Sequence, residues 1–131
     1  MRKKIILFSA IIAIIAAAVV LALMLRPEAK FDGDRISNPG RFALQFNRMN
    51  TADSETMALR EGDALHVSWR IESGHADIAI GIQGEEPVYR ADHRSAGDEA
   101  DFYVEIPKAG AYTITVSARD AKGRIEFLKK E

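Results

Sequence analysis

The chain has 131 residues, no cysteine and a formal net charge of −1, so it has room for one domain and not comfortably for two. The lack of cysteine excludes disulfides, thiolate catalysis, cysteine-based zinc sites and the acylated cysteine of a lipoprotein. Four cations lie within residues 1–26, and residues 27–131 carry 14 Lys and Arg against 19 Asp and Glu, a net charge of −5. An acidic surface repels phosphate backbones, so we expect no nucleic-acid partner.

The first element is an apolar segment over residues 5–25, in which Ser9 is the only polar side chain. As a helix of 1.5 Å rise per residue it is about 31 Å long, which matches the roughly 30 Å of bilayer hydrocarbon. The basic residues 1–4 precede it and favour a cytoplasmic N-terminus. We therefore predict a transmembrane helix that anchors the chain in the lipid bilayer and places residues 26–131 outside the cytoplasm.

A cleaved signal peptide is the main alternative for this segment. Its apolar region usually has only 7 to 15 residues, with small residues before the cleavage point. Cutting after Ala18 or Ala22 would leave a markedly apolar new terminus. We favour an uncut single-pass anchor, while a secreted product after cleavage stays open, as does a buried core helix. Residues 26–41 hold two prolines, two glycines and alternating charges without periodicity, so we predict a linker there.

From residue 42 to 131 apolar residues recur with a period of two, which is typical of half-buried strands. The stretch over residues 54–61 is ambiguous, but Met57 and Leu59 favour a strand. The expected inward residues are Phe42, Leu44 and Phe46; Leu65, Val67, Trp69 and Ile71; Ile78, Ile80 and Ile82; Phe102, Val104 and Ile106; Tyr112, Ile114, Val116 and Ala118; and Ile125 and Phe127.

Turn residues separate these runs, among them 72–75, 95–100 and 120–123, where Gly123 could close a hairpin. Seven or eight antiparallel strands, each with one apolar face, bury those faces by stacking two sheets or by closing a barrel. We predict an all-β antiparallel sandwich, jelly-roll or immunoglobulin-like, over residues 42–131.

The stretches "NTADSETMALREGDALHVSW" and "VEIPKAGAYTITVSARDAKGRIEF" resemble small membrane-anchored proteins of Gram-positive (Firmicutes-type) bacteria. These have a basic N-terminus, one helix and a compact β domain. The likeness covers nearly the whole chain, and it implies a fold, a topology and a host class but no activity. The pattern is also distantly similar to GOLD-like and pre-peptidase β-sandwich modules, whose calcium-binding acids are not matched here.

One predicted loop gathers residues with catalytic and metal-binding chemistry. His93 lies in this loop, over residues 90–101, together with Asp92, Asp98, Glu99 and Asp101. These acids lack regular ligand spacing, and no serine stands in a nucleophile elbow. We predict no enzyme, metal or cofactor, and keep as the alternative a cell-envelope hydrolase that uses His93 with the nearby acids.

Aromatic residues and one strip of polar residues offer binding candidates. Trp69 is in phase with the core, Tyr112 is expected as a corner tyrosine bonded to a loop backbone, and Tyr103 is out of phase and exposed. The candidate partner-binding face, for which an ordinary solvated sheet face is the alternative, consists of His66, Ser68, Arg70, Tyr103, Thr113, Thr115, Ser117 and Arg119. We therefore expect a membrane-anchored, non-enzymatic binding or accessory module, whose partner is another membrane or envelope protein, an envelope polymer or a second copy.

Overall fold

The computed structural model describes residues 30–130, so the predicted membrane helix over residues 5–25 lies outside the described residues. Within residues 30–130 no helix is long and apolar enough to cross a bilayer. The described part consists of antiparallel strands: β1 (Phe31–Asn38), β2 (Arg41–Met49), β3 (Ala52–Leu59), β4 (Ala64–Ile82), β5 (Tyr89–Ser95), β6 (Glu99–Glu105) and β7 (Gly110–Lys130).

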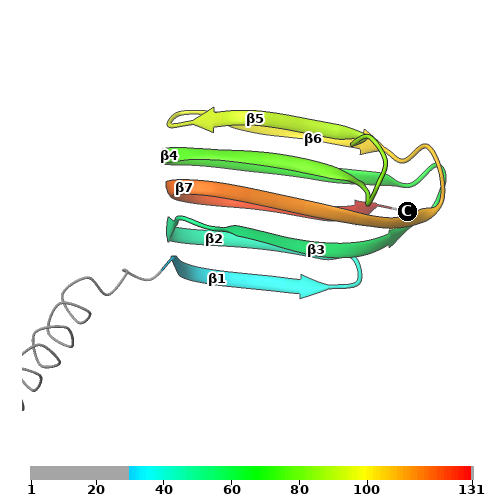
Figure 1. Cartoon of the computed structure of the whole chain (residues 1–131), viewed down its shortest axis with the longest axis horizontal. Helices are drawn as coiled ribbons and strands as arrows, with labels where there is room; N and C mark the ends of the chain where they lie inside the picture. The colour runs from blue at the N-terminus through cyan, green and yellow to red at the C-terminus, as the bar shows by residue number, and fades with distance from the viewer. Residues whose placement is uncertain (1–29, 131) are drawn as a thin grey trace, which may run out of the picture.

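Two long strands, β4 and β7, bend halfway and contribute to two stacked layers (Figure 1). Layer A has the order β1, β2, the second half of β7, the first half of β4, and β6. Layer B has the order β3, the first half of β7, the second half of β4, and β5. The predicted all-β antiparallel sandwich is confirmed, and its segment order, apart from β1, is that of a jelly roll.

The bends correct two of the predicted turns. Residues 72–75 were expected to form a turn and residues 120–123 a hairpin turn, but each lies inside one continuous strand. The register of β4 against β7 shifts between Ile71 and Ser73 and again between Ser73 and His75. Such bulges bend a strand and increase its twist, so glycine and polar residues here redirect the chain from one layer to the other.

Two glycines make the paired bends sterically possible. A β-carbon on Gly74 would lie 2.2 Å from the carbonyl oxygen of Asp120, and one on Gly123 would lie 2.1 Å from that of Arg70. Gly74 also has a φ of 69°, a conformation that glycine adopts without steric cost. The backbones of β4 and β7 therefore touch where both strands bend.

The core lies between the layers and is built from the predicted alternating residues. Trp69 is 3% exposed, and its ring packs edge-on against Phe102. Tyr112 is fully buried and its hydroxyl donates to the carbonyl oxygen of Lys108 at 2.7 Å, so both predictions for these aromatics are confirmed. Met57 and Leu59 are buried as well, which confirms the strand over the ambiguous stretch.

The predicted linker over residues 26–41 is wrong for its second half, because Phe31–Asn38 forms β1 along the edge of β2. The side chains of residues 32–38 are all exposed, so the strand leaves no alternating pattern in the sequence. Arg35 turns toward layer B and contacts the carboxylates of Asp53 at 2.7 Å and Glu55 at 2.9 Å on β3. This contact closes the side of the sandwich between the two edge strands.

Candidate binding surface

The outward side of layer A, named face A, aligns side chains from five strands in three rows. The cross-strand register defines the first row as Asn38, Arg41, Leu128, His66 and Tyr103. The second row consists of Ile36, Ala43, Glu126, Ser68 and Asp101. The third row consists of Asp34, Gln45, Arg124, Arg70 and Glu99. Because strands of one layer lie side by side, these rows form one continuous surface.

An aromatic platform lies at the β6 end of the first row. Tyr103 is 61% exposed, and its ring packs on that of His66 with centroids 4.9 Å apart. His66 Nε2 lies 2.5 Å from Asp101 Oδ1, an interaction that helps to hold the imidazole beside the phenol. Tyr103 is thus packed against one neighbouring ring and otherwise largely open to solvent.

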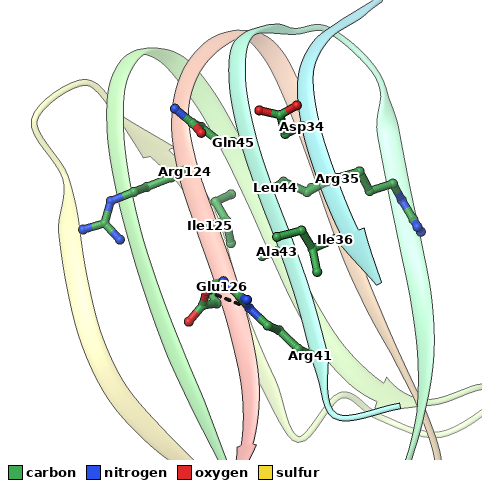
Figure 2. Close-up of a pocket in the computed structure, with 10 residues that line it drawn as sticks. All are labelled: Asp34, Arg35, Ile36, Arg41, Ala43, Leu44, Gln45, Arg124, Ile125 and Glu126. Atoms are coloured by element: carbon green, nitrogen blue, oxygen red, sulfur yellow. Dashed lines mark hydrogen bonds and ion pairs between the residues drawn. The ribbon is translucent and has the colours of Figure 1, made fainter. Parts of the chain in front are cut away.

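A depression of about 490 Å³ lies at the opposite end of face A, over β1, β2 and β7. Figure 2 shows Ile36 and Ala43 at its centre, with Arg41 bonded to Glu126 on one side. Ile36 is 43% exposed, a high value for a branched apolar side chain. Apolar surface beside a few fixed polar groups is the usual composition of a binding site.

The predicted partner-binding strip is split by the fold. His66, Ser68, Arg70 and Tyr103 lie together on face A. The remaining residues lie on the outward side of layer B or at the bend after it: Thr113, Thr115, Ser117 and Arg119. Alternation along β7 predicted correctly which side chains point outward, but the halves of β7 and β4 that carry the two groups belong to different layers.

The histidine and acids of the hydrolase alternative do not form a common site. The predicted loop over residues 90–101 is instead β5, a short turn and β6. His93 occupies a bulge of β5, its backbone N–H donates to Asp77, and its ring lies 4.4 Å from that of His75. The acids have other partners: Asp92 with Arg90, Asp98 with Arg94, Glu99 with Arg70 and Asp101 with His66.

The separation of these histidines and acids also concerns metal binding. In residues 30–130 no group of three or more histidines and acids is placed to hold a metal ion.

Sequence reasoning missed the half of face A that includes Ile36, Gln45 and Arg124. Ile36 was missed because its strand was taken for a linker. Arg124 precedes the inward Ile125, so strand alternation already placed it outward. What the sequence could not show is that Gln45 and Arg124 are cross-strand neighbours, since that depends on the pairing of β2 with β7.

Comparison with known proteins assigns no family. No protein-family model matches the chain, and no curated protein matches its sequence. A carbohydrate-binding module of Cellvibrio mixtus lichenase 5A, solved with cellotriose, is similar over 79% of this chain and 88% of its own, with a TM-score of 0.43 and 8% identity. The cupin domain of Drosophila melanogaster CENP-C is similar over 76% of this chain and 71% of its own, with a TM-score of 0.33 and 11% identity. Likenesses this distant carry no inference about ligand or activity, and the resemblance to Gram-positive membrane-anchored proteins stays a prediction.

Proposed function

We propose that the chain is a membrane-held, extracytoplasmic binding module that engages a protein partner through face A. The observation that carries this proposal is Tyr103, a 61% exposed aromatic ring packed on His66. Aromatic and arginine side chains are enriched at protein interfaces and dominate their energetics. A ring that is already positioned loses little conformational entropy when a partner covers it.

The size of face A fits a modest protein interface. Five strands about 4.8 Å apart and about seven residues long cover an area of roughly 24 Å by 23 Å. That area corresponds to a total buried surface near 1,100 Å², the range of transient complexes. The mixture of Tyr103, Leu128 and Ile36 with charged neighbours also suits a partner that dissociates. This size and composition are compatible with the accessory role beside another envelope protein that we propose.

The membrane attachment is supported by the apolar sequence, and the position of β1 sets how far from the bilayer an anchored sandwich could lie. The apolar segment ends at residue 25, and β1 begins at Phe31. Five intervening residues span at most about 18 Å when fully extended. A helix anchor over residues 5–25 would therefore hold the sandwich close to the bilayer, where neighbouring membrane proteins are within reach.

The proposal can be tested by photocrosslinking in intact cells with the full chain. A benzophenone amino acid is placed at position 103 on face A and, as the matched control, at position 56 on the outward side of layer B. We expect a discrete crosslinked product from position 103 and none from position 56. Equal products from both positions, or none from position 103, would reject face A as the binding surface.

A further inference from the structure

Two arginines stand directly opposite each other in the third row of face A. Arg70 on β4 and Arg124 on β7 are paired in the cross-strand register, and like charges in this arrangement destabilise a sheet. Arg70 approaches Glu99 at 3.2 Å, whereas Arg124 has no hydrogen-bond or ion-pair partner among residues 30–130. The fold therefore leaves one guanidinium unneutralised beside another.

More hydrogen-bond donors surround this pair. A depression of about 170 Å³ lies over β2, β4 and β7. Three cationic side chains and two amides are among its lining residues: Arg70, Lys122, Arg124, Gln45 and Asn47. The backbone at Gly123 also lines it.

Two acids lie among these donors: Glu72 also lines the depression, and Glu99 pairs with Arg70. Glu99 and Arg70 are both more than half exposed, and Glu72 lies 3.9 Å from Lys122 with both side chains about half exposed. Exposed ion pairs contribute little free energy, so a stronger acceptor can replace either carboxylate. The depression thus combines an excess of positive charge with donors whose present partners are weakly held.

The geometry points to this depression as a binding site for a phosphate group, held by Arg124 and Arg70 with Lys122 and the two amides around it. Guanidinium groups bind phosphate oxygens through two parallel hydrogen bonds. A phosphate presents acceptor oxygens in several directions, and the donors come from three strands. The two arginines belong to the third row of face A, but they lie about 13 Å along β4 from the aromatic platform, at 3.3 Å per residue. Phosphate binding there is therefore a function additional to the proposed partner binding and does not depend on it.

The phosphate could belong to a lipid headgroup or to a free phosphate compound. The depression lies at the end of the sandwich where β1 begins, because Gln45 and Phe46 pair with Asp34 and Gly33. Figure 1 shows the start of β1 at the same end as the bends of β4 and β7. A chain anchored through residues 5–25 would hold this end near the headgroups, so both sources are tested.

The test is a titration of the full chain followed by amide chemical shifts of residues 45, 47 and 122–124. In uncharged maltoside micelles, inorganic phosphate is added at constant ionic strength with chloride as the reference. We expect saturable shifts at these amides, and about tenfold weaker affinity in Arg124→Gln and in Arg70→Gln, as for the loss of a charge-assisted bond. Arg60→Gln, which removes the same charge in the turn between β3 and β4, should stay within about twofold of the parent chain.

A second arm separates the two sources of phosphate. The chain is placed in nanodiscs of phosphatidylcholine with and without phosphatidylglycerol, and no free phosphate is added. Shifts at the same amides that require phosphatidylglycerol and Arg124 assign the site to headgroups, and saturation in micelles alone assigns it to free phosphate. Chemical shifts that neither saturate with phosphate nor respond to phosphatidylglycerol would overturn the site. Equal effects of Arg60→Gln and Arg124→Gln on the affinity would overturn it as well. The crosslinking at position 103 does not depend on phosphate, so failure of the proposed partner surface is seen separately.

Discussion

At Gly123 the backbone of β7 passes so close to β4 that a β-carbon would lie 2.1 Å from the carbonyl oxygen of Arg70. Real β-carbons do not approach backbone oxygens so closely, and neither backbone can retreat without breaking the ladder between the two strands. Gly74 meets β7 in the same way from the other strand. A single hydrogen atom at each of these two positions is therefore what allows the strands to bend together.

Substitution at this contact should be costly. We expect Gly123→Ala to lower the free energy of unfolding by more than about 3 kcal/mol, because the new methyl group must displace the backbone of Arg70. Urea unfolding followed by circular dichroism measures the change. Gly40→Ala is the matched control, since its β-carbon would meet only Lys129 at 3.8 Å, and it should change stability by less than about 0.5 kcal/mol. A loss at Gly123 no larger than at Gly40 would show that the bend tolerates a side chain.

Strand β1 is held in place by few interactions. Its side chains from residue 32 to 38 are exposed, so it contributes little apolar burial beyond Phe31, which packs against the core. It is held by the ladder to β2 and by Arg35, whose guanidinium reaches Asp53 and Glu55 and lies over the ring of Phe42 at 5.1 Å. This strand connects the sandwich to residue 30 and the segment before it.

Removal of this contact should loosen β1 without unfolding the sandwich. We expect Arg35→Gln to speed hydrogen exchange of the amides of residues 31–38 by about fivefold, the effect of losing a small network of exposed ion pairs. Amides in β4 and β7 should exchange as in the parent chain. Uniform acceleration in all strands would mean that Arg35 supports global stability and not the attachment of β1.

The same contact predicts a pH dependence. Hydrogen bonds from Ser37 and then from Arg35 lower the pKa of Glu55. A carboxyl whose folded pKa is depressed stabilises above its unfolded pKa, about 4.3, and loses that contribution as the pH falls through the folded value. Protection of β1, corrected for intrinsic exchange, should therefore decrease below about pH 4.3, and Arg35→Gln should reduce this decrease. If the protection of the β1 amides, corrected for intrinsic exchange, did not change with pH, the assigned role of Glu55 would be contradicted.

How far the sequence predicted the elements depends on what each pattern can encode. Alternation identified the core residues, including Met57 and Tyr112, because a strand buried on one face must alternate. It missed β1, since a strand exposed on both faces carries no such pattern. It also divided β4 and β7 at Gly74 and Gly123, because a glycine at a bend between layers looks the same in sequence as one in a hairpin.

The candidate site was predicted only in part for a related reason. His66, Ser68, Arg70 and Tyr103 share face A, as the strand parity suggested. The threonines of β7 were grouped with them, although Thr113 and Thr115 face outward from layer B. The alternation of residues along a strand predicts on which side of the strand a side chain lies, but not the layer to which the strand belongs. A surface built from several strands can therefore be predicted only when the pairing of those strands is known.

At the scale of the whole molecule, the two outer surfaces differ in chemistry. Face A holds the aromatic platform, the depression around Ile36 and the arginine pair, whereas the outward side of layer B carries short hydroxyl side chains along β3 and β7. The two sides belong to one domain that is connected to the N-terminal segment through residue 30. If a partner covers face A, as we propose, side chains on face A should be less accessible in the cell than those on the outward side of layer B.

The most direct measurement uses the absence of cysteine from the chain. Ser68→Cys places a single thiol on face A and Ser54→Cys places one on the outward side of layer B, and each is labelled in intact cells with a membrane-impermeant maleimide. The account predicts that both thiols react without lysis. It also predicts that the thiol at position 68 reacts several times more slowly than in the purified chain, while the thiol at position 54 reacts at its purified rate. Labelling of both only after lysis would contradict the external location, and equal relative rates would contradict a partner on face A.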